Sequence, residues 1–291
     1  MSLSIWNHLQ GVDFKQTYYD AGGVRTRVIE AGEGPVLVFL HGTGGHAEAY
    51  VKNIAAHARD FRVLAVDLVG HGYTDAPDHA DYGMQGYVDH LRDLLDAIGA
   101  ESACISGESL GASIACWFAL QHPERVKRLV LNTGLPLAPQ DEQGISQMRD
   151  LLERARKASG SPTLDAVRAR MRWLVVDEAS LTDEIIQTRF EIYSQPGRAP
   201  VIGKITEQAI GQLIDPATQT TWYRPDQLKE IPCPVLLIWT THNPGQPVAL
   251  AEQAAALIPD ARLEVLTGSA HWPQWEEPEA FNRIHLDFLR G

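Results

Sequence analysis

The chain has 291 residues, of which 44% are hydrophobic and 21% are charged, a composition typical of a globular protein long enough to bury a sizeable core. Its 25 Lys and Arg residues against 37 Asp and Glu residues give a net charge of −12, which argues against binding to nucleic acid or to an anionic membrane surface. The N-terminal residues lack a signal-peptide pattern, and no apolar run is long enough to cross a bilayer. The sequence therefore predicts a soluble cytoplasmic protein.

The cysteines, Cys104, Cys116 and Cys233, are odd in number and widely spaced, so they form neither a disulfide framework nor a zinc-binding pattern. Each lies in or beside an apolar segment. We therefore expect buried free thiols with a packing role. Nothing in the sequence predicts a metal or another cofactor.

Strand and helix patterns alternate over residues 1–132. After a short N-terminal arm, Gly22–Gly23 separates two β-type runs, and the strands that follow are nearly continuous apolar runs, as in strands buried on both faces. Apolar residues at helical spacing predict a helix over 83–98, and a second helix begins near Leu110. The strands expected in this part cover residues 15–19, 24–29, 35–40, 62–66, 102–106 and 128–132.

Helix signals replace strand signals between residues 133 and 230. Ser180 with Asp183 resembles a capping box that opens one of these helices. The helices expected here cover residues 141–158, 163–175, 181–194 and 203–214. Beyond residue 231 the alternation returns, with strands over 235–239 and 263–266 and helices over 250–257 and 280–289.

This order of elements predicts an α/β fold with a mostly parallel eight-stranded sheet covered by helices. Residues 1–132 and 231–291 are expected to form its core. Residues 133–230 are expected to form a helical lid over the carboxyl ends of the strands.

Residues Gly107-Glu108-Ser109-Leu110-Gly111 stand between an expected strand and an expected helix. A Gly-x-Ser-x-Gly run in that context is typical of a nucleophile elbow, a tight turn that presents the serine hydroxyl at the carboxyl edge of the sheet. A side chain at Gly107 or Gly111 would obstruct the close packing of strand and helix. Ser109 is thus the candidate nucleophile.

A serine nucleophile needs a base, and His271 is the candidate because it follows the last expected strand, as the base does in this chain order. The loop after the 235–239 strand, where an orienting acid would stand, contains no Asp or Glu. We expect Asn243 to occupy that position, since its side-chain carbonyl can accept the Nδ1–H of His271. His242 is a competing candidate, and Glu276 and Glu277 follow His271 too closely to orient it easily.

An oxyanion requires two preorganised N–H donors. The Leu110 amide is one candidate, and the amide of Thr43 or Gly44, in the glycine-rich turn that begins at Gly42, is the other. That turn lacks the spacing of a phosphate-binding or dinucleotide-binding loop.

Two further side chains stand out. Arg189, in the helical region, is either a solvated helix charge or a cation that reaches down to a substrate carboxylate. Trp272, beside the candidate base, either lines the pocket or packs in the core.

The chain resembles the α/β-hydrolase superfamily over essentially its whole length. Within it, the chain is similar to the meta-cleavage-product hydrolases, which hydrolyse a carbon–carbon bond in 2-hydroxy-6-oxo-hexa-2,4-dienoates. The residues that carry this resemblance are 107–111, 122–126, 188–193, 195–197 and 271–276.

The resemblance implies a cofactor-free enzyme whose small-molecule substrate bears a carboxylate. Arg189 matches the arginine that binds this carboxylate, Trp272 matches a pocket aromatic, and Gly42 and Glu108 are expected beside the substrate. The chain departs from the family in having Glu108 where Asn is usual and in lacking the acid near Asn243. By analogy with the family, a homodimer or larger homo-oligomer is expected.

Two other activities stay open at this point. A carboxylesterase or lactonase would use Ser109 and His271 on a small ester. A ligand-binding protein with little turnover would be consistent with the missing acid.

Overall fold

The computed structural model describes residues 4–139, 141–215 and 219–291, and it contains one eight-stranded sheet in the order β1-β2-β4-β3-β5-β6-β7-β8. Strand β2 pairs antiparallel with both β1 and β4, and the other pairs are parallel. The strands are β1 (Phe14–Ala21), β2 (Val24–Ala31), β3 (Val36–Leu40), β4 (Arg62–Val66), β5 (Ala103–Glu108), β6 (Val126–Asn132), β7 (Val235–Thr240) and β8 (Ala261–Leu266). The predicted fold class is confirmed.

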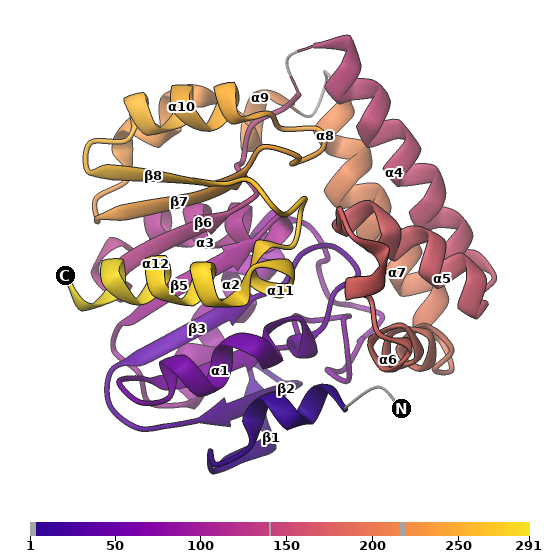
Figure 1. Cartoon of the computed structure of the whole chain (residues 1–291), viewed down its shortest axis with the longest axis horizontal. Coiled ribbons are helices and arrows are strands. Elements are labelled where there is room, and N and C mark those ends of the chain that lie inside the picture. Colours follow the sequence, from indigo (N-terminus) through magenta and orange to yellow (C-terminus); the bar gives the residue numbers. More distant parts are fainter. Residues whose placement is uncertain (1–3, 140, 216–218) are drawn as a thin grey trace.

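Helices cover both faces of the sheet (Figure 1). Because successive side chains of a strand point to opposite faces, Val38 and Leu40 enter one hydrophobic cluster while Leu37 and Phe39 enter another. The first cluster contains residues of α2 (Met84–Ala97), α3 (Leu110–Gln121) and α10 (Val248–Leu257), and the second contains residues of α1 (Val51–His57) and α12 (Pro278–Arg290). Burial on both faces explains why these strands are continuous apolar runs rather than alternating ones.

The described elements between β6 and β7 are all helical, and they stand at the carboxyl ends of the parallel strands (Figure 1). They are α4 (Glu142–Gly160), α5 (Leu164–Met171), η4 (Arg172–Leu174), η5 (Glu178–Ser180), α6 (Asp183–Tyr193), α7 (Arg198–Thr206), η6 (Glu207–Gly211), α8 (Gln212–Ile214), α9 (Gln219–Trp222) and η7 (Pro225–Glu230). The last long helix expected here begins at Arg198 rather than at residue 203, since Pro200 lies within its first turn, where proline is tolerated.

The expected capping box at Ser180 and Asp183 is wrong. Helix α6 begins at Asp183, and its N-cap is Thr182, whose hydroxyl accepts the Ile185 amide at 3.3 Å. A threonine directly before the first helical residue competes successfully with a serine two positions earlier.

Short helical elements complete the fold. The N-terminal arm contains the 3₁₀ helix η1 (Ile5–Leu9), and η3 (Pro123–Arg125) and α11 (Pro273–Glu276) precede β6 and α12. No helix is predicted from the sequence for the segment from η2 (Ala47–Tyr50) into α1. Its helix is short and its residues are mostly buried, so no polar face marks it. Cys104, Cys116 and Cys233 are free and buried, as expected.

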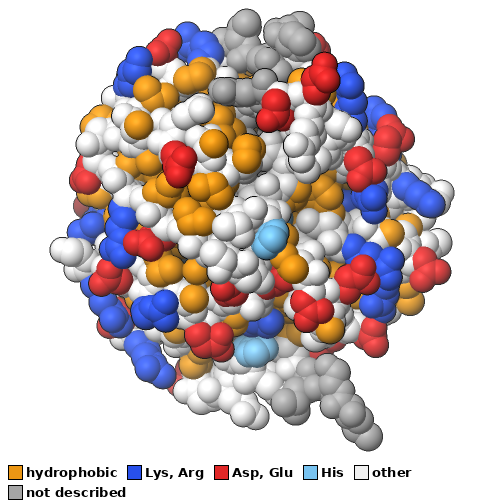
Figure 2. Space-filling model, turned by 45° about the horizontal axis from the view of Figure 1, so that its top comes forward, with side chains coloured by type: hydrophobic (Ala, Val, Ile, Leu, Met, Phe, Trp, Pro, Cys, Tyr) orange, Lys and Arg blue, Asp and Glu red, His pale blue; other side chains and the backbone are white. Residues whose placement is uncertain are grey.

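Charged groups lie in two different settings. On the face drawn in Figure 2, acidic and basic side chains are interspersed. Inside the protein, Arg27 forms ion pairs with Glu48 at 2.6 Å and Asp67 at 3.0 Å, and Asp67 also accepts the Ala47 amide at 2.7 Å. This buried network ties the loop after β4 to the loop after β3. Within the described ranges, no helix is long and apolar enough to cross a membrane.

Several histidines are buried in the neutral form. His57 donates from Nδ1 to the Asn53 carbonyl, so its Nε2 accepts from His285, whose other nitrogen accepts the Ser106 hydroxyl. Burial lowers the pKa of His57, His41 and His90 to about 4. Protonation of any of them would place an unpaired charge in the core.

We expect the protein to lose stability as the pH falls from 6.5 towards 4. In this window the unfolded chain binds protons on these histidines and the folded chain does not, so the free energy of unfolding rises with pH. The contribution of these histidines to stability reaches its full value above pH 6.5. Urea denaturation between pH 7 and pH 5 measures the slope. His90→Gln should flatten it by up to ~1.4 kcal/mol per pH unit. The exposed His79→Gln should leave it unchanged, and an equal effect of both variants would contradict this account.

Candidate active site

Ser109 lies in the turn between β5 and α3 with φ 55° and ψ −115°, a backbone conformation that residues other than glycine rarely adopt. Its amide donates to the Asn132 carbonyl at 3.0 Å, and its own carbonyl accepts the Ala112 amide at 3.0 Å. The strained backbone is thus held between β6 and the first turn of α3. This geometry is that of a nucleophile elbow.

Three glycines allow this turn to pack. A Cβ at Gly107 would collide with the backbone of Gly111, and a Cβ at Gly111 would collide with the Leu40 carbonyl of β3. Gly134 was not singled out in the sequence, yet a Cβ there would lie 2.5 Å from the Ser109 Cα. It follows the strand next to the elbow in the sheet, and only this spatial proximity identifies it.

His271 is buried in the loop after β8, where its Nδ1 contacts Asn243 Oδ1 at 2.7 Å. The amide nitrogen of Asn243 donates to the Gln246 carbonyl at 2.9 Å, which fixes the side-chain oxygen towards the imidazole. Nδ1 therefore carries a proton, and Nε2 faces the cavity. His242 is exposed and lies away from this contact.

The loop that carries His271 is fixed by hydrogen bonds from several directions. Thr133 donates to the His271 carbonyl at 2.9 Å, and the His271 and Trp272 amides both donate to the Leu174 carbonyl of η4. Glu276 is directed away from the imidazole: one of its oxygens accepts the Ala270 amide and the other accepts two amides after η4. The acids after His271 thus position its backbone and do not orient its ring.

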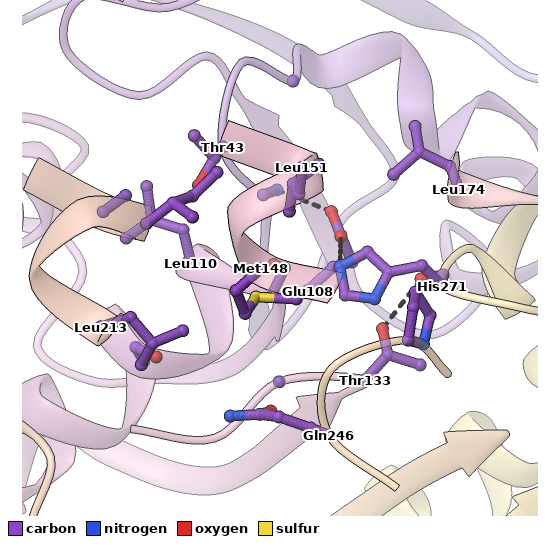
Figure 3. A pocket seen from close by; sticks show the side chains of 18 of the residues that line it. Thr43, Glu108, Leu110, Thr133, Met148, Leu151, Leu174, Leu213, Gln246 and His271 are labelled. Atoms are coloured by element: carbon purple, nitrogen blue, oxygen red, sulfur yellow. Dashed lines mark hydrogen bonds and ion pairs between the residues drawn. The ribbon is translucent and has the colours of Figure 1, made fainter. Parts of the chain in front are cut away.

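The Nε2 side of His271 faces a carboxylate. Glu108 is 2% exposed, its Oε1 lies 3.2 Å from His271 Nε2, and its Oε2 accepts the Gly42 amide at 2.6 Å (Figure 3). Ser109 and His271, which are both described, form no direct hydrogen bond with each other. The Glu108 carboxylate therefore occupies the position beside Nε2.

The candidate oxyanion donors lie in two adjacent elements. Leu110 is the first residue of α3, where helix N–H groups are free to bind an anion, and Thr43 lines the same cavity. Gly44 has φ 68° and is not among the described lining residues, and its carbonyl accepts the Tyr193 hydroxyl at 3.1 Å. Of the two alternatives in this turn, the geometry favours Thr43.

Arg189 extends from α6 into the cavity, where its guanidinium lies 5.3 Å from the centre of the Trp272 ring. It is 1% exposed, its Nε has no partner, and no carboxylate pairs with it in the described part of the chain. Burial lowers the pKa of Arg189. Arg189 and Trp272 thus both line the cavity, while their roles in binding a substrate stay predictions.

A second buried cation, Arg170 of α5, lines the same cavity and was not predicted. Its guanidinium lies 5.7 Å from the Trp173 ring centre and makes one long 3.5 Å contact to the Thr43 carbonyl, while Nη1 has no partner. Burial lowers the pKa of Arg170 to about 10. The Trp173 ring in turn packs edge-on against His271, 4.7 Å between centres. The sequence around Arg170 does not distinguish this buried arginine from a solvent-exposed arginine on a helix, so the sequence could not predict its position in the cavity.

The rest of the cavity is largely apolar. Figure 3 places Leu110 and Leu213 on the side away from His271, with Met148 and Leu151 of α4 nearby. Met148, Leu151 and Ile210 also belong to one buried cluster between α4 and η6. The cavity thus combines a charged region around Arg170, Arg189 and Glu108 with an apolar region contributed by α4 and by residues 209–213.

The sequence profile of the α/β hydrolase fold matches residues 35–278. The chain therefore belongs to the α/β-hydrolase fold family.

Within that family the chain resembles the meta-cleavage-product hydrolases, as the sequence predicted. A 2-hydroxy-6-oxononadienedioate/2-hydroxy-6-oxononatrienedioate hydrolase from Pseudomonas putida is 30% identical, covering 90% of both chains. A hydrolase of the same name from Burkholderia vietnamiensis is 31% identical over 93% of both chains. The structure of a meta-cleavage product hydrolase from Pseudomonas fluorescens superposes with a TM-score of 0.81 at 28% identity, covering 95% of this chain and 97% of that one.

Replacing Asn243 by Ala should lower kcat by roughly 10–100-fold, because the variant loses a hydrogen bond worth about 1.5–3 kcal/mol to the ring that becomes charged in the reaction. The rate of hydrolysis of a chromogenic ester or dienoate measures the effect. The neighbouring His242→Ala is the matched control and should retain full activity. A defect in His242→Ala as large as that in Asn243→Ala would reassign the orienting role.

Proposed function

We propose that the protein is a serine-dependent hydrolase that cleaves a carbon–carbon bond in a 2-hydroxy-6-oxo-dienoate. The observation that carries this proposal is the pair of buried, unpaired guanidinium groups, Arg170 and Arg189, in the cavity that contains Ser109 and His271. A buried charge without a partner costs several kcal/mol. A substrate carboxylate would supply that partner, and Arg189 is the residue that we expect to bind it directly.

The charge of the cavity fits one such carboxylate. Arg170 and Arg189 contribute two positive charges, and the Glu108 carboxylate contributes one negative charge. The remainder is one positive charge. The apolar region formed by Met148, Leu151 and neighbouring residues would then hold the other end of the substrate, since the described lining residues include no cation besides Arg170 and Arg189.

The resemblance to the meta-cleavage-product hydrolases implies the course of the reaction. With His271 and Arg189 assisting, the dienol is first converted to its keto form, so that the later leaving group is a stabilised carbanion. Ser109, or a water molecule activated by His271, then attacks the C6 carbonyl, and the amides of Leu110 and Thr43 bind the resulting oxyanion. Formation of the keto form places a proton on C5. When the C5–C6 bond then breaks, the electron pair is delocalised onto the C2 oxygen, which receives a proton to give a 2-hydroxydienoate, and water supplies the hydroxyl group of the carboxylic acid formed from C6.

Residues 133–230 are proposed to act as the lid of this site. They supply both arginines and most of the apolar lining, whereas Ser109, His271 and Asn243 come from the sheet core. This division would allow the lid to determine substrate choice while the core retains the reaction. The homo-oligomer and the cytoplasmic location stay predictions.

Arg189→Ala should lower kcat/KM for a dienoate by roughly 100-fold or more, since it removes a buried cation that pairs with the substrate carboxylate. The loss of the yellow dienoate colour measures this rate. Hydrolysis of p-nitrophenyl acetate, which has no carboxylate, should change little. Arg168→Ala, on the exposed side of α5, is the control and should match the unmodified protein. Equal losses on dienoate and ester would instead indicate a general defect, and activity on esters alone would favour a carboxylesterase.

The apolar region predicts a preference among dienoates. A substrate with a methyl or phenyl substituent at C6 should have a kcat/KM roughly 10–100-fold higher than a nonadienedioate. The second carboxylate of the nonadienedioate would be buried in the apolar region without a paired cation, which is costly. The two kinds of substrate correspond to names among the relatives, which include a 2-hydroxy-6-oxo-2,4-heptadienoate hydrolase and the dienedioate hydrolases. Equal values for both would contradict the assignment of the apolar region to the C6 substituent.

A further inference from the structure

Glu108 is the carboxylate in direct contact with the imidazole of His271 among the described residues. It precedes the candidate nucleophile at the end of β5 and is 2% exposed. The site is built around it: the Gly42 amide donates to Oε2 at 2.6 Å, and a Cβ at position 42 would lie 2.7 Å from both carboxylate oxygens. Gly42 therefore both binds the carboxylate and leaves space for it.

The opposite edge of the imidazole lacks a negative charge. Asn243 accepts the Nδ1 proton at 2.7 Å and fixes the ring, but a neutral amide provides no counter-charge when the ring becomes an imidazolium. His271 is buried, so such a charge would be poorly solvated. A counter-charge must come from another residue, and Glu108 Oε1, 3.2 Å from Nε2, is placed to supply it.

We propose that Glu108 is a positioning residue that stabilises the protonated form of His271 from its Nε2 side and replaces the acid that is missing on the Nδ1 side. This proposal rests on the proposed serine chemistry. As the Ser109 oxygen bonds to the electrophile, its proton passes to His271 Nε2. The imidazolium formed there is paired with the Glu108 carboxylate until the proton is returned to the leaving group. Glu108 itself neither gains nor loses a proton.

Two cations share the cavity with the Glu108 carboxylate. Arg170 and Arg189 line this cavity, and neither forms an ion pair with a carboxylate within the described ranges. Their positive charges attract the negative charge at position 108. An asparagine there would leave this cavity with two positive charges and His271 with no counter-ion.

The test separates the charge of Glu108 from its shape. The proteins compared are the unmodified chain, Glu108→Gln, Asn243→Asp and the double variant, with Ser109→Ala as the blank. The readout is the rate at which a fluorophosphonate labels Ser109, followed by mass spectrometry. Labelling forms an Oγ–P bond, breaks the P–F bond and transfers the serine proton to His271, so the result does not depend on whether dienoates are substrates.

We expect Glu108→Gln to lower the maximal labelling rate roughly 10–100-fold with little change in the half-saturating probe concentration. In the Glu108→Gln background, adding Asn243→Asp should raise the labelling rate at least tenfold above that of Glu108→Gln alone, because it places a negative charge at the other edge of the ring. A residue with a merely structural role would not show this rescue, since Gln retains an acceptor for the Gly42 amide.

Three outcomes would overturn the proposal: unchanged or faster labelling in Glu108→Gln, no rescue in the double variant, or no labelling of Ser109 in the unmodified chain. If Glu108→Gln does not fold, Glu108→Asp and Glu108→Asn form a second pair of equal size. The Asp variant should then label at least tenfold faster than the Asn variant, and equal rates would refute the role of the charge. Absence of dienoate turnover together with normal labelling would refute the proposed substrate and leave this role intact.

Discussion

The close approach of the β5–α3 turn to its neighbours is the constraint on which the rest of the site depends. Gly107, Gly111 and Gly134 remove the side chains that would separate the turn from α3, β3 and the segment after β6. The strained conformation of Ser109 persists because hydrogen bonds on both sides fix it. Every other group of the site is placed relative to this serine by the ends of neighbouring parallel strands, which is a general property of open α/β sheets.

The electrostatics of the cavity differ from those of a site with an acid behind its histidine. His271 has a neutral acceptor on Nδ1 and a carboxylate on Nε2, and two buried cations stand across the cavity. Each of these groups is costly to bury alone. Together Arg170, Arg189 and Glu108 leave one positive charge in excess, so the cavity would be electrostatically complementary to a monocarboxylate.

The fold and the principal candidate site residues could be predicted from the sequence for physical reasons. Strands buried on both faces are long apolar runs, and Gly-x-Ser-x-Gly between a strand and a helix has few other uses, so the sheet and Ser109 could be predicted. The chain order then identifies His271, and the position of Asn243 in the loop after β7 is reproduced by its 2.7 Å contact. Local spacing was less reliable where two caps compete, as at Ser180 and Thr182.

The remaining residues depend on proximity that sequence spacing does not contain. Arg170 and the exposed Arg168 lie two positions apart on α5, and only the packing of that helix against the core separates a buried cation from a solvated one. The contact between Glu108 and His271 joins residues that are far apart in the chain. Trp173 likewise becomes a neighbour of His271 only when η4 lies over the loop after β8.

The hydrogen bonds from His271 and Trp272 to Leu174, with those from Val176 and Asp177 to Glu276, have a consequence for the route into the cavity. Displacing η4 would break the backbone hydrogen bonds of His271, so η4 is expected to stay in place and to act as a hinge for the rest of residues 133–230. Substrate and product would then enter and leave between α4 and the helical residues 198–214. Side-chain packing rather than backbone hydrogen bonding closes the cavity there. A gate at that place would open without disturbing the reacting groups.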